Sequence, residues 1–79
     1  MRVISEHTLP EGLKATLYAW NGKYILKLEN GSLEQTYKIS EMDVSGQKEV
    51  EEFLKSVGFL EKAKAVFGLM EENLETFLS

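Results

Sequence analysis

The first forty residues alternate between apolar and polar side chains, and two Asn-Gly dipeptides interrupt the alternation. Asn21-Gly22 and Asn30-Gly31 each lie between short runs of strand-forming residues. Both residue types tolerate positive φ, which a two-residue type I′ hairpin turn needs at both central positions. The pattern therefore predicts strands over residues 13–20, 23–29 and 32–39, joined by two tight antiparallel turns.

Another strand is predicted at the N-terminus, over residues 2–9. The segment Pro10-Glu11-Gly12 follows it, between Leu9 and Leu13. Proline at the first turn position and glycine at the third fit a three-residue hairpin loop with Gly12 in the left-handed region. Together the three turns predict a four-stranded antiparallel meander, with the strands in the order 1-2-3-4.

After residue 40 the apolar spacing changes to the three-and-four period of a helix. Apolar residues recur at this spacing from Val50 to Val57, and Gly58 is a predicted stop. The spacing resumes after Gly58 and continues to Leu78, which predicts either one long amphipathic helix or two helices. Because glycine costs about 1 kcal/mol relative to alanine inside a helix, we expect a break or kink at Gly68.

Strands followed by helices favour an α+β fold in which two or three C-terminal helices pack on one face of the sheet. The 79 residues are predicted to form one domain, with the meander over residues 1–40 and the helical layer over residues 41–79. Ser40 and Ser45 are competing candidates for the cap of the first helix. A chain of this length buries a little over about 60% of its extended surface, which allows one modest core and no deep active-site cavity.

The turn registers predict which side chains share a face of the sheet, because alternate residues of a strand point to the same side. The predicted inner face lies under the helices and is largely apolar. It collects Val3, Ser5, His7, Leu9, Leu13, Ala15, Leu17, Ala19, Tyr24, Leu26, Leu28, Leu33, Gln35, Tyr37 and Ile39. The predicted outer face has no second helical layer to cover it. Its three clearest rows across the sheet are Ile4, Tyr18, Ile25 and Thr36; Glu6, Thr16, Lys27 and Glu34; and Arg2, Trp20, Lys23 and Lys38.

The outer face carries the candidate interaction site, where aromatic and aliphatic side chains lie beside lysines. Its members are Tyr18, Trp20, Ile25, Ile4, Lys23 and Lys38. Tryptophan and tyrosine are favoured interface anchors, so the leading hypothesis is a non-catalytic module that binds an unidentified protein partner or forms a homodimer. Aromatic side chains flanked by cations also stack single-stranded bases, so weak nucleic-acid binding on the same face is the alternative. An ordinary solvated sheet face with cross-strand aromatic pairs has the same pattern.

His7 is the only histidine. It is predicted to lie on the inner face opposite Ala15, with Ser5 and Gln35 as its nearest polar neighbours. Buried polar groups are usually hydrogen-bonded, so we expect a satisfied, partly buried histidine. A small enzyme is a distant third hypothesis, because it needs His7 in an open cleft beside a carboxylate. We expect no catalytic residue, metal or cofactor, since the glutamates of residues 49–52 and 71–75 fit solvated helix faces.

The composition narrows the class of partner. The net charge is −4 and is uneven: residues 1–40 carry five basic and four acidic side chains, whereas residues 41–79 carry four and nine. Binding to duplex DNA needs a concentrated basic surface, which this balance disfavours. The chain has no cysteine for a disulfide. It also has no apolar run of the ~18 residues that a membrane span needs. We therefore expect a cytoplasmic protein that makes no membrane contact.

Overall fold

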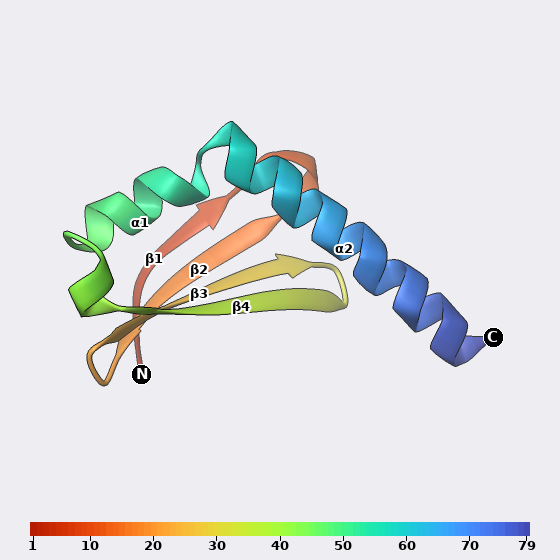
Figure 1. The fold of residues 1–79 in the computed structure, drawn as a ribbon, viewed down its shortest axis with the longest axis horizontal. Coiled ribbons are helices and arrows are strands. Elements are labelled where there is room, and N and C mark those ends of the chain that lie inside the picture. The colour runs from red at the N-terminus through yellow and green to blue at the C-terminus, as the bar shows by residue number, and fades with distance from the viewer.

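The structure, a computed structural model, describes residues 1–79 and consists of a four-stranded antiparallel sheet followed by two helices (Figure 1). The strands are β1 (Arg2–Thr8), β2 (Lys14–Trp20), β3 (Lys23–Asn30) and β4 (Leu33–Ser40), and they lie in the order β1-β2-β3-β4. A short 3-10 turn, Glu41–Asp43, leads to α1 (Gln47–Leu54) and α2 (Val57–Leu78). The predicted α+β class and the predicted strand order are confirmed.

The β2–β3 turn has the predicted type I′ conformation, with Asn21 at φ 52° and Gly22 at φ 74°. In the loop before β2, Gly12 adopts the expected left-handed conformation at φ 81°. Glu11 is also left-handed, at φ 63°, which the hairpin pattern did not predict. The backbone N–H of Leu9 donates a 2.8 Å hydrogen bond across this loop to the carbonyl of Leu13, so the loop closes as a tight hairpin.

The β3–β4 turn is displaced by one residue from the prediction. Asn30 pairs with Leu33, so the two loop residues are Gly31 and Ser32 rather than Asn30 and Gly31. Gly31 supplies the positive φ of this turn, at 65°. Each β3 residue therefore pairs with a β4 residue two positions later than predicted. Because side chains alternate with a period of two, the face assignments of β4 survive this shift.

A β-bulge in β1 exchanges the two faces near the N-terminus. The register passes from Ser5 opposite Leu17 to Val3 opposite Tyr18, with Ile4 as the extra residue. Val3 is 51% exposed beside Tyr18, whereas Ile4 is partly buried against the core. The prediction that placed Val3 on the inner face and Ile4 on the outer face is therefore wrong. A bulge inserts one residue into a strand and reverses the alternation beyond it.

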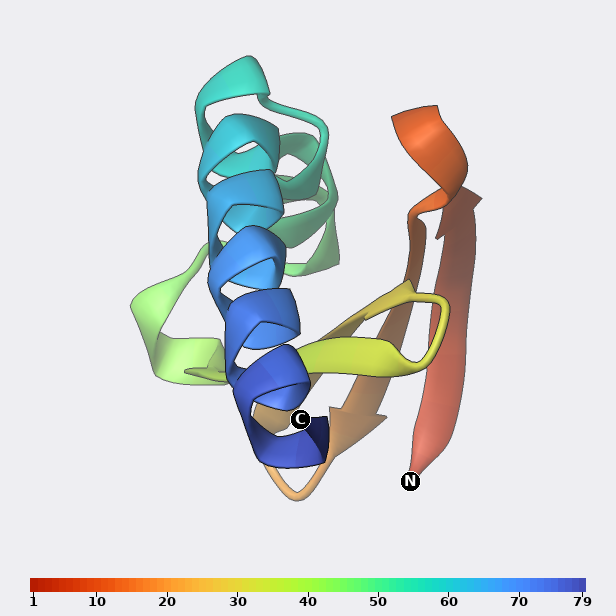
Figure 2. The same cartoon turned by 90° about the vertical axis from the view of Figure 1, so that its right-hand side faces the viewer.

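The core is a single cluster of apolar side chains from the sheet and both helices. It contains Leu9, Leu13, Ala15, Leu17, Leu26, Leu28, Val50, Leu54, Ala63 and Phe67. Figure 2 shows α1 and α2 on one side of the view and strands β1 and β2 on the other. The strand residues of this cluster all belong to the predicted inner face, which confirms the alternation that was read from the turns.

The helix boundaries differ from the prediction at two glycines. The Ser56 hydroxyl accepts a hydrogen bond of 3.3 Å from the backbone N–H of Phe59 and caps α2, so Gly58 lies inside its first turn instead of ending a helix. The helix then continues through Gly68 without a break, contrary to the expectation. A single glycine costs about 1 kcal/mol, and the surrounding helix formers and the packing of Phe67 are sufficient to offset it.

The C-terminal part of α2 extends beyond the sheet. Phe67 is 2% exposed, whereas every residue from 71 to 79 is exposed. Figure 1 shows this blue end of the helix projecting past the β3–β4 turn. The helix therefore has a packed half and an overhanging half.

Candidate functional site

The structure brings five of the six predicted site residues together on the outer face. Across the sheet, Tyr18 lies opposite Ile25, which lies opposite Lys38. In the adjacent row Trp20 lies opposite Lys23. The sixth predicted residue, Ile4, is absent from this group because the bulge turns it toward the core, and Val3 takes its place beside Tyr18.

The apolar part of this face is only partly accessible. Trp20 is 49% exposed at the end of β2, and Tyr18 is half-buried. Ile25 is buried although it lies outside the core cluster. Side chains directly opposite and diagonal on a sheet lie within reach of one another, so the large neighbours of Ile25 cover it. Trp20 and Val3 are therefore the apolar side chains that a partner would meet first.

The charges of the outer face are not evenly compensated. Lys27 forms ion pairs with Glu34 at 3.6 Å and with Glu29 at 3.9 Å. Lys23, opposite Trp20, and Lys38, opposite Ile25, form no ion pair. Arg2 forms none either, but the bulge places it opposite Ala19, among the inner-face residues, and not in the predicted outer row. A shallow open depression of about 400 Å³ adjoins Trp20 and is lined by both Arg2 and Glu41. Lys23 and Lys38 therefore lack an ionic partner on this face, whereas Lys27 has two.

His7 lies beside a carboxylate that the sequence did not place there. Its Nε2 atom shares a hydrogen bond of 3.0 Å with the Ser5 hydroxyl, and the same atom lies 3.5 Å from Oε2 of Glu51 on α1. In a hydrolase triad, the serine and the carboxylate contact opposite ring nitrogens. Here both contact one nitrogen, so the trio has the composition of a triad without its geometry.

The pKa of Glu51 is lowered from its ordinary value of 4.5, chiefly because the Ser5 hydroxyl donates a hydrogen bond to the carboxylate. Burial opposes this shift, while Gln47 and His7 add smaller favourable contributions. A carboxylate with a lowered pKa is a poor proton acceptor, so this environment favours a structural ion over a general base. The only sequence signal for this contact is that Glu51 directly follows Val50, an apolar residue of the helical pattern.

The other glutamates of the two acidic clusters lie on exposed helix surfaces. Glu49 accepts hydrogen bonds from the backbone N–H and the hydroxyl of Ser45, at 2.7 and 2.6 Å, and these bonds lower its pKa. Gly46 occupies the cap position of α1, so the prediction of Ser45 or Ser40 as its cap is wrong; Ser40 caps the 3-10 turn Glu41–Asp43 instead. No three acidic or histidine side chains are grouped as ligands for a metal ion.

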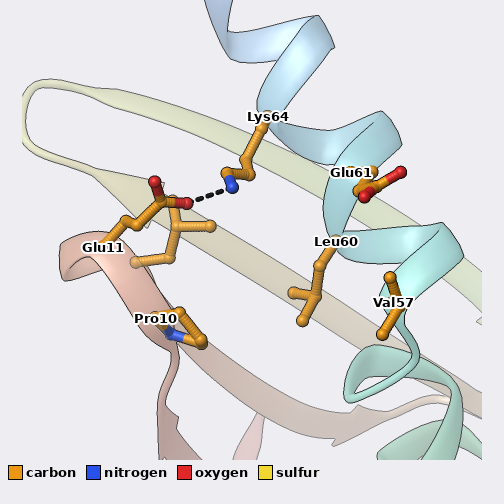
Figure 3. Close-up of a pocket in the computed structure, with 7 residues that line it drawn as sticks. Pro10, Glu11, Val57, Leu60, Glu61 and Lys64 are labelled. Carbon is orange, nitrogen blue, oxygen red and sulfur yellow. Dashed lines mark ion pairs between the residues drawn. The ribbon is translucent and has the colours of Figure 1, made fainter.

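A small pocket of about 170 Å³ lies between the first hairpin loop and the start of α2 (Figure 3). Pro10, Val57 and Leu60 line it, and an ion pair between Lys64 and Glu11 crosses one side of it. Pockets that bind small molecules are typically about 300–1,000 Å³. The pocket is below this range, and the ion pair joins the loop to the helix.

A further apolar surface, which the sequence analysis did not single out, lies on the overhanging half of α2. Phe77 is 84% exposed, Leu78 is 72% exposed and Leu74 is 39% exposed. The helical spacing of these residues predicts an amphipathic helix. The period shows that they share one face of the helix, but it does not show how far the sheet beneath extends.

Comparisons with known proteins give no relationship: no family model matches the chain, and no curated protein or solved structure is significantly similar to it. Neither helix has the combination of length and apolar character that is required to cross a membrane.

Proposed function

We propose that the protein is a small, non-catalytic interaction module that binds a protein partner or a second copy of itself through the outer sheet face around Tyr18 and Trp20. In this proposal both helices cover the inner face and leave the outer face free. The observation that carries it is the half-exposed Trp20 opposite the unpaired side chain of Lys23, with the unpaired Lys38 farther across the same face.

The chemistry of this face indicates the kind of surface that fits it. Tryptophan supplies a large rigid contact area and is common among the residues that dominate binding energy. Cations without a partner near that contact favour acidic groups on the other protein and disfavour basic ones. The expected partner surface therefore combines apolar side chains with carboxylates.

The surroundings of His7 support a binding role over a catalytic one. The Ser5 hydroxyl and the Glu51 carboxylate meet the same imidazole nitrogen, so Glu51 is not positioned to orient the ring for proton transfer from the serine. The lowered pKa of Glu51 also stabilises its charged form. We interpret this cluster as a polar contact that joins β1 to α1.

The variant Trp20→Ala tests the proposal. It is expected to keep the fold and to weaken association, measured by sedimentation and by capture of partners on immobilised protein. Phe53→Ala is the matched control, because Phe53 is an aromatic residue of similar exposure, at 56%, outside the outer face. If Trp20→Ala changes neither the sedimenting mass nor the set of captured proteins, the proposal is wrong.

Weak binding of single-stranded nucleic acid is the second candidate, and the observation that favours it is that Lys23 and Lys38, on the same face as Trp20, have no ionic partner. Bases that stack on an indole quench its fluorescence, and phosphate contacts weaken as salt rises. Trp20 is the only tryptophan, so its emission reports this face alone. Salt-dependent quenching by oligonucleotides would support this candidate, and constant emission at low salt would reject it.

A further inference from the structure

The overhanging half of α2 continues the apolar stripe of the core into solvent. Leu60, Ala63, Phe67, Met70, Leu74 and Phe77 follow one another at alternating intervals of three and four residues. Ala63 and Phe67 are 2% exposed, whereas Phe77, on the same stripe, is 84% exposed. The overhanging half of α2 therefore exposes an apolar surface that no other part of the chain covers.

The charges around this surface limit what can cover it. Glu71 and Glu75 lie one turn apart, each three residues before an apolar side chain of the overhang, Leu74 or Leu78. Two helix ends packed together would bring these glutamates against their copies, which is unfavourable because like charges repel. An anionic membrane surface is disfavoured for the same reason. The fitting surface is apolar and cationic.

The outer sheet face of this chain has that character. It presents Trp20 and Val3 to solvent, and neither Lys23, opposite Trp20, nor Lys38, opposite Ile25, forms an ion pair. The overhang cannot reach this face in its own molecule, because α2 is one unbroken helix held in the core by Phe67. Figure 1 shows the C-terminus and the β2–β3 turn, which follows Trp20, at opposite ends of the molecule.

We propose that the overhanging end of α2 from one copy docks on the outer sheet face of a second copy. This inference rests on the proposed function, and it identifies the partner of the outer face. Leu74, Phe77 and Leu78 cover the apolar side chains around Trp20. Glu71 and Glu75 lie against Lys23 and Lys38.

A reciprocal dimer follows from this contact. Each copy has one helix end and one receiving face, so a two-fold pair makes two identical contacts, whereas an open chain makes one contact per added copy. The second contact of the pair forms at high effective concentration, which favours closure. The charged part of the contact is exposed at its rim, so association is expected to weaken as salt rises.

A charge exchange between two variants tests this arrangement. The sheet variant is Lys23→Glu with Lys38→Glu, and the helix variant is Glu71→Lys with Glu75→Lys. All four side chains are exposed, so the substitutions are expected to preserve the fold. In each variant alone, both contacts bring like charges together. In an equimolar mixture, both contacts between the two variants bring opposite charges together.

Sedimentation equilibrium supplies the readout. We expect the unmodified chain to show twice the 9.0 kDa mass of one copy, each variant alone to show 9.0 kDa, and the mixture to recover the doubled mass. If the sheet variant loses the dimer while the helix variant keeps it, the docking inference fails and the proposed function stands. If the sheet variant remains dimeric, the outer face does not mediate self-association. This result overturns both the docking inference and the proposal that the chain dimerises through its outer face. An unmodified chain that remains at 9.0 kDa overturns the docking inference.

Discussion

The side-chain amide of Gln35 donates a hydrogen bond of 3.0 Å to the backbone carbonyl of Ala63, which joins β4 to α2 inside the core. The Tyr37 hydroxyl donates a second hydrogen bond of 2.5 Å to the amide oxygen of Gln35. Gln35 is the only polar residue among the buried ones. A hydrogen bond is electrostatically stronger in surroundings of low dielectric, so the bond from Gln35 to Ala63 ties α2 to β4. The bond from Tyr37, within β4, orients the Gln35 amide.

Replacement of Gln35 by leucine keeps the volume and removes both hydrogen bonds. We expect a loss of about 1–3 kcal/mol in the free energy of unfolding, because the Tyr37 hydroxyl loses its acceptor. The measurement is the urea midpoint. Gln47→Leu is the control: Gln47 is exposed, and its weak bond to Glu51 is 3.3 Å long, so its change is expected to stay within about 0.5 kcal/mol. Equal midpoints for the two variants would contradict this role of Gln35.

The sequence predicted those features of the fold that depend on local chemistry. Asn21-Gly22 specified one turn correctly because both residues tolerate positive φ. The turn at Gly31 was misplaced by one residue because Ser32 is also an acceptable turn residue, and nothing local distinguishes the two registers. The bulge at Ile4 has no residue signature, so one member of the candidate site was assigned to the wrong face.

The remaining differences depend on contacts between distant segments. Glu51 of α1 lies 3.5 Å from His7 of β1, and a helical pattern in the sequence predicts the polar side of a helix but not which strand lies next to it. The exposure of Phe77 follows from the length of α2 relative to the sheet. Apolar periodicity predicts which side chains share a face of the helix, but it does not predict whether another element covers that face.

Two phenylalanines of α2 provide a test of its division into a packed and an overhanging half. Phe67→Ala is expected to cost about 3–5 kcal/mol, because it leaves a cavity in the core. Phe77→Ala is expected to change the stability of a single copy by no more than about 0.5 kcal/mol, since its ring is exposed. Thermal unfolding in dilute solution compares the two. A comparable loss from Phe77→Ala would mean that the end of the helix is packed within the molecule.

The Ser56 cap accounts for the start of α2 directly after α1. Its hydroxyl accepts a hydrogen bond from the N–H of Phe59, one of the donors that the first helical turn leaves free. We expect Ser56→Ala to destabilise the protein by about 1 kcal/mol. Chemical denaturation measures this loss, and Ser79→Ala at the exposed C-terminus is the control. A smaller effect for Ser56→Gly than for Ser56→Ala is expected as well, because glycine is a tolerated cap.

The contact between Ser5 and Glu51 predicts a pH dependence of stability. The pKa of Glu51 is lowered in the folded state, so its contribution is fully present above the unfolded value of 4.5 and is lost as the pH falls through the folded value. Glu51→Gln is therefore expected to lower stability near neutral pH and to approach the unmodified protein in acid. Urea titrations at several pH values measure the difference. Glu52→Gln is the control, since that carboxylate forms no hydrogen bond or ion pair, and a constant difference across the pH range would refute the role of Glu51.

Substitutions of two glycines by alanine are expected to have effects of opposite sign. At Gly68, in the helix interior, an added Cβ would meet no atom within 4 Å, so Gly68→Ala is expected to stabilise a single copy by about 1 kcal/mol. At Gly31 the space is equally open, but φ is +65°, so Gly31→Ala is expected to destabilise by about 1–2 kcal/mol. Unfolding midpoints of the two variants give both signs. Stabilisation by Gly31→Ala would show that the β3–β4 turn adopts a different conformation, and destabilisation by Gly68→Ala would show that the helix bends at this residue after all.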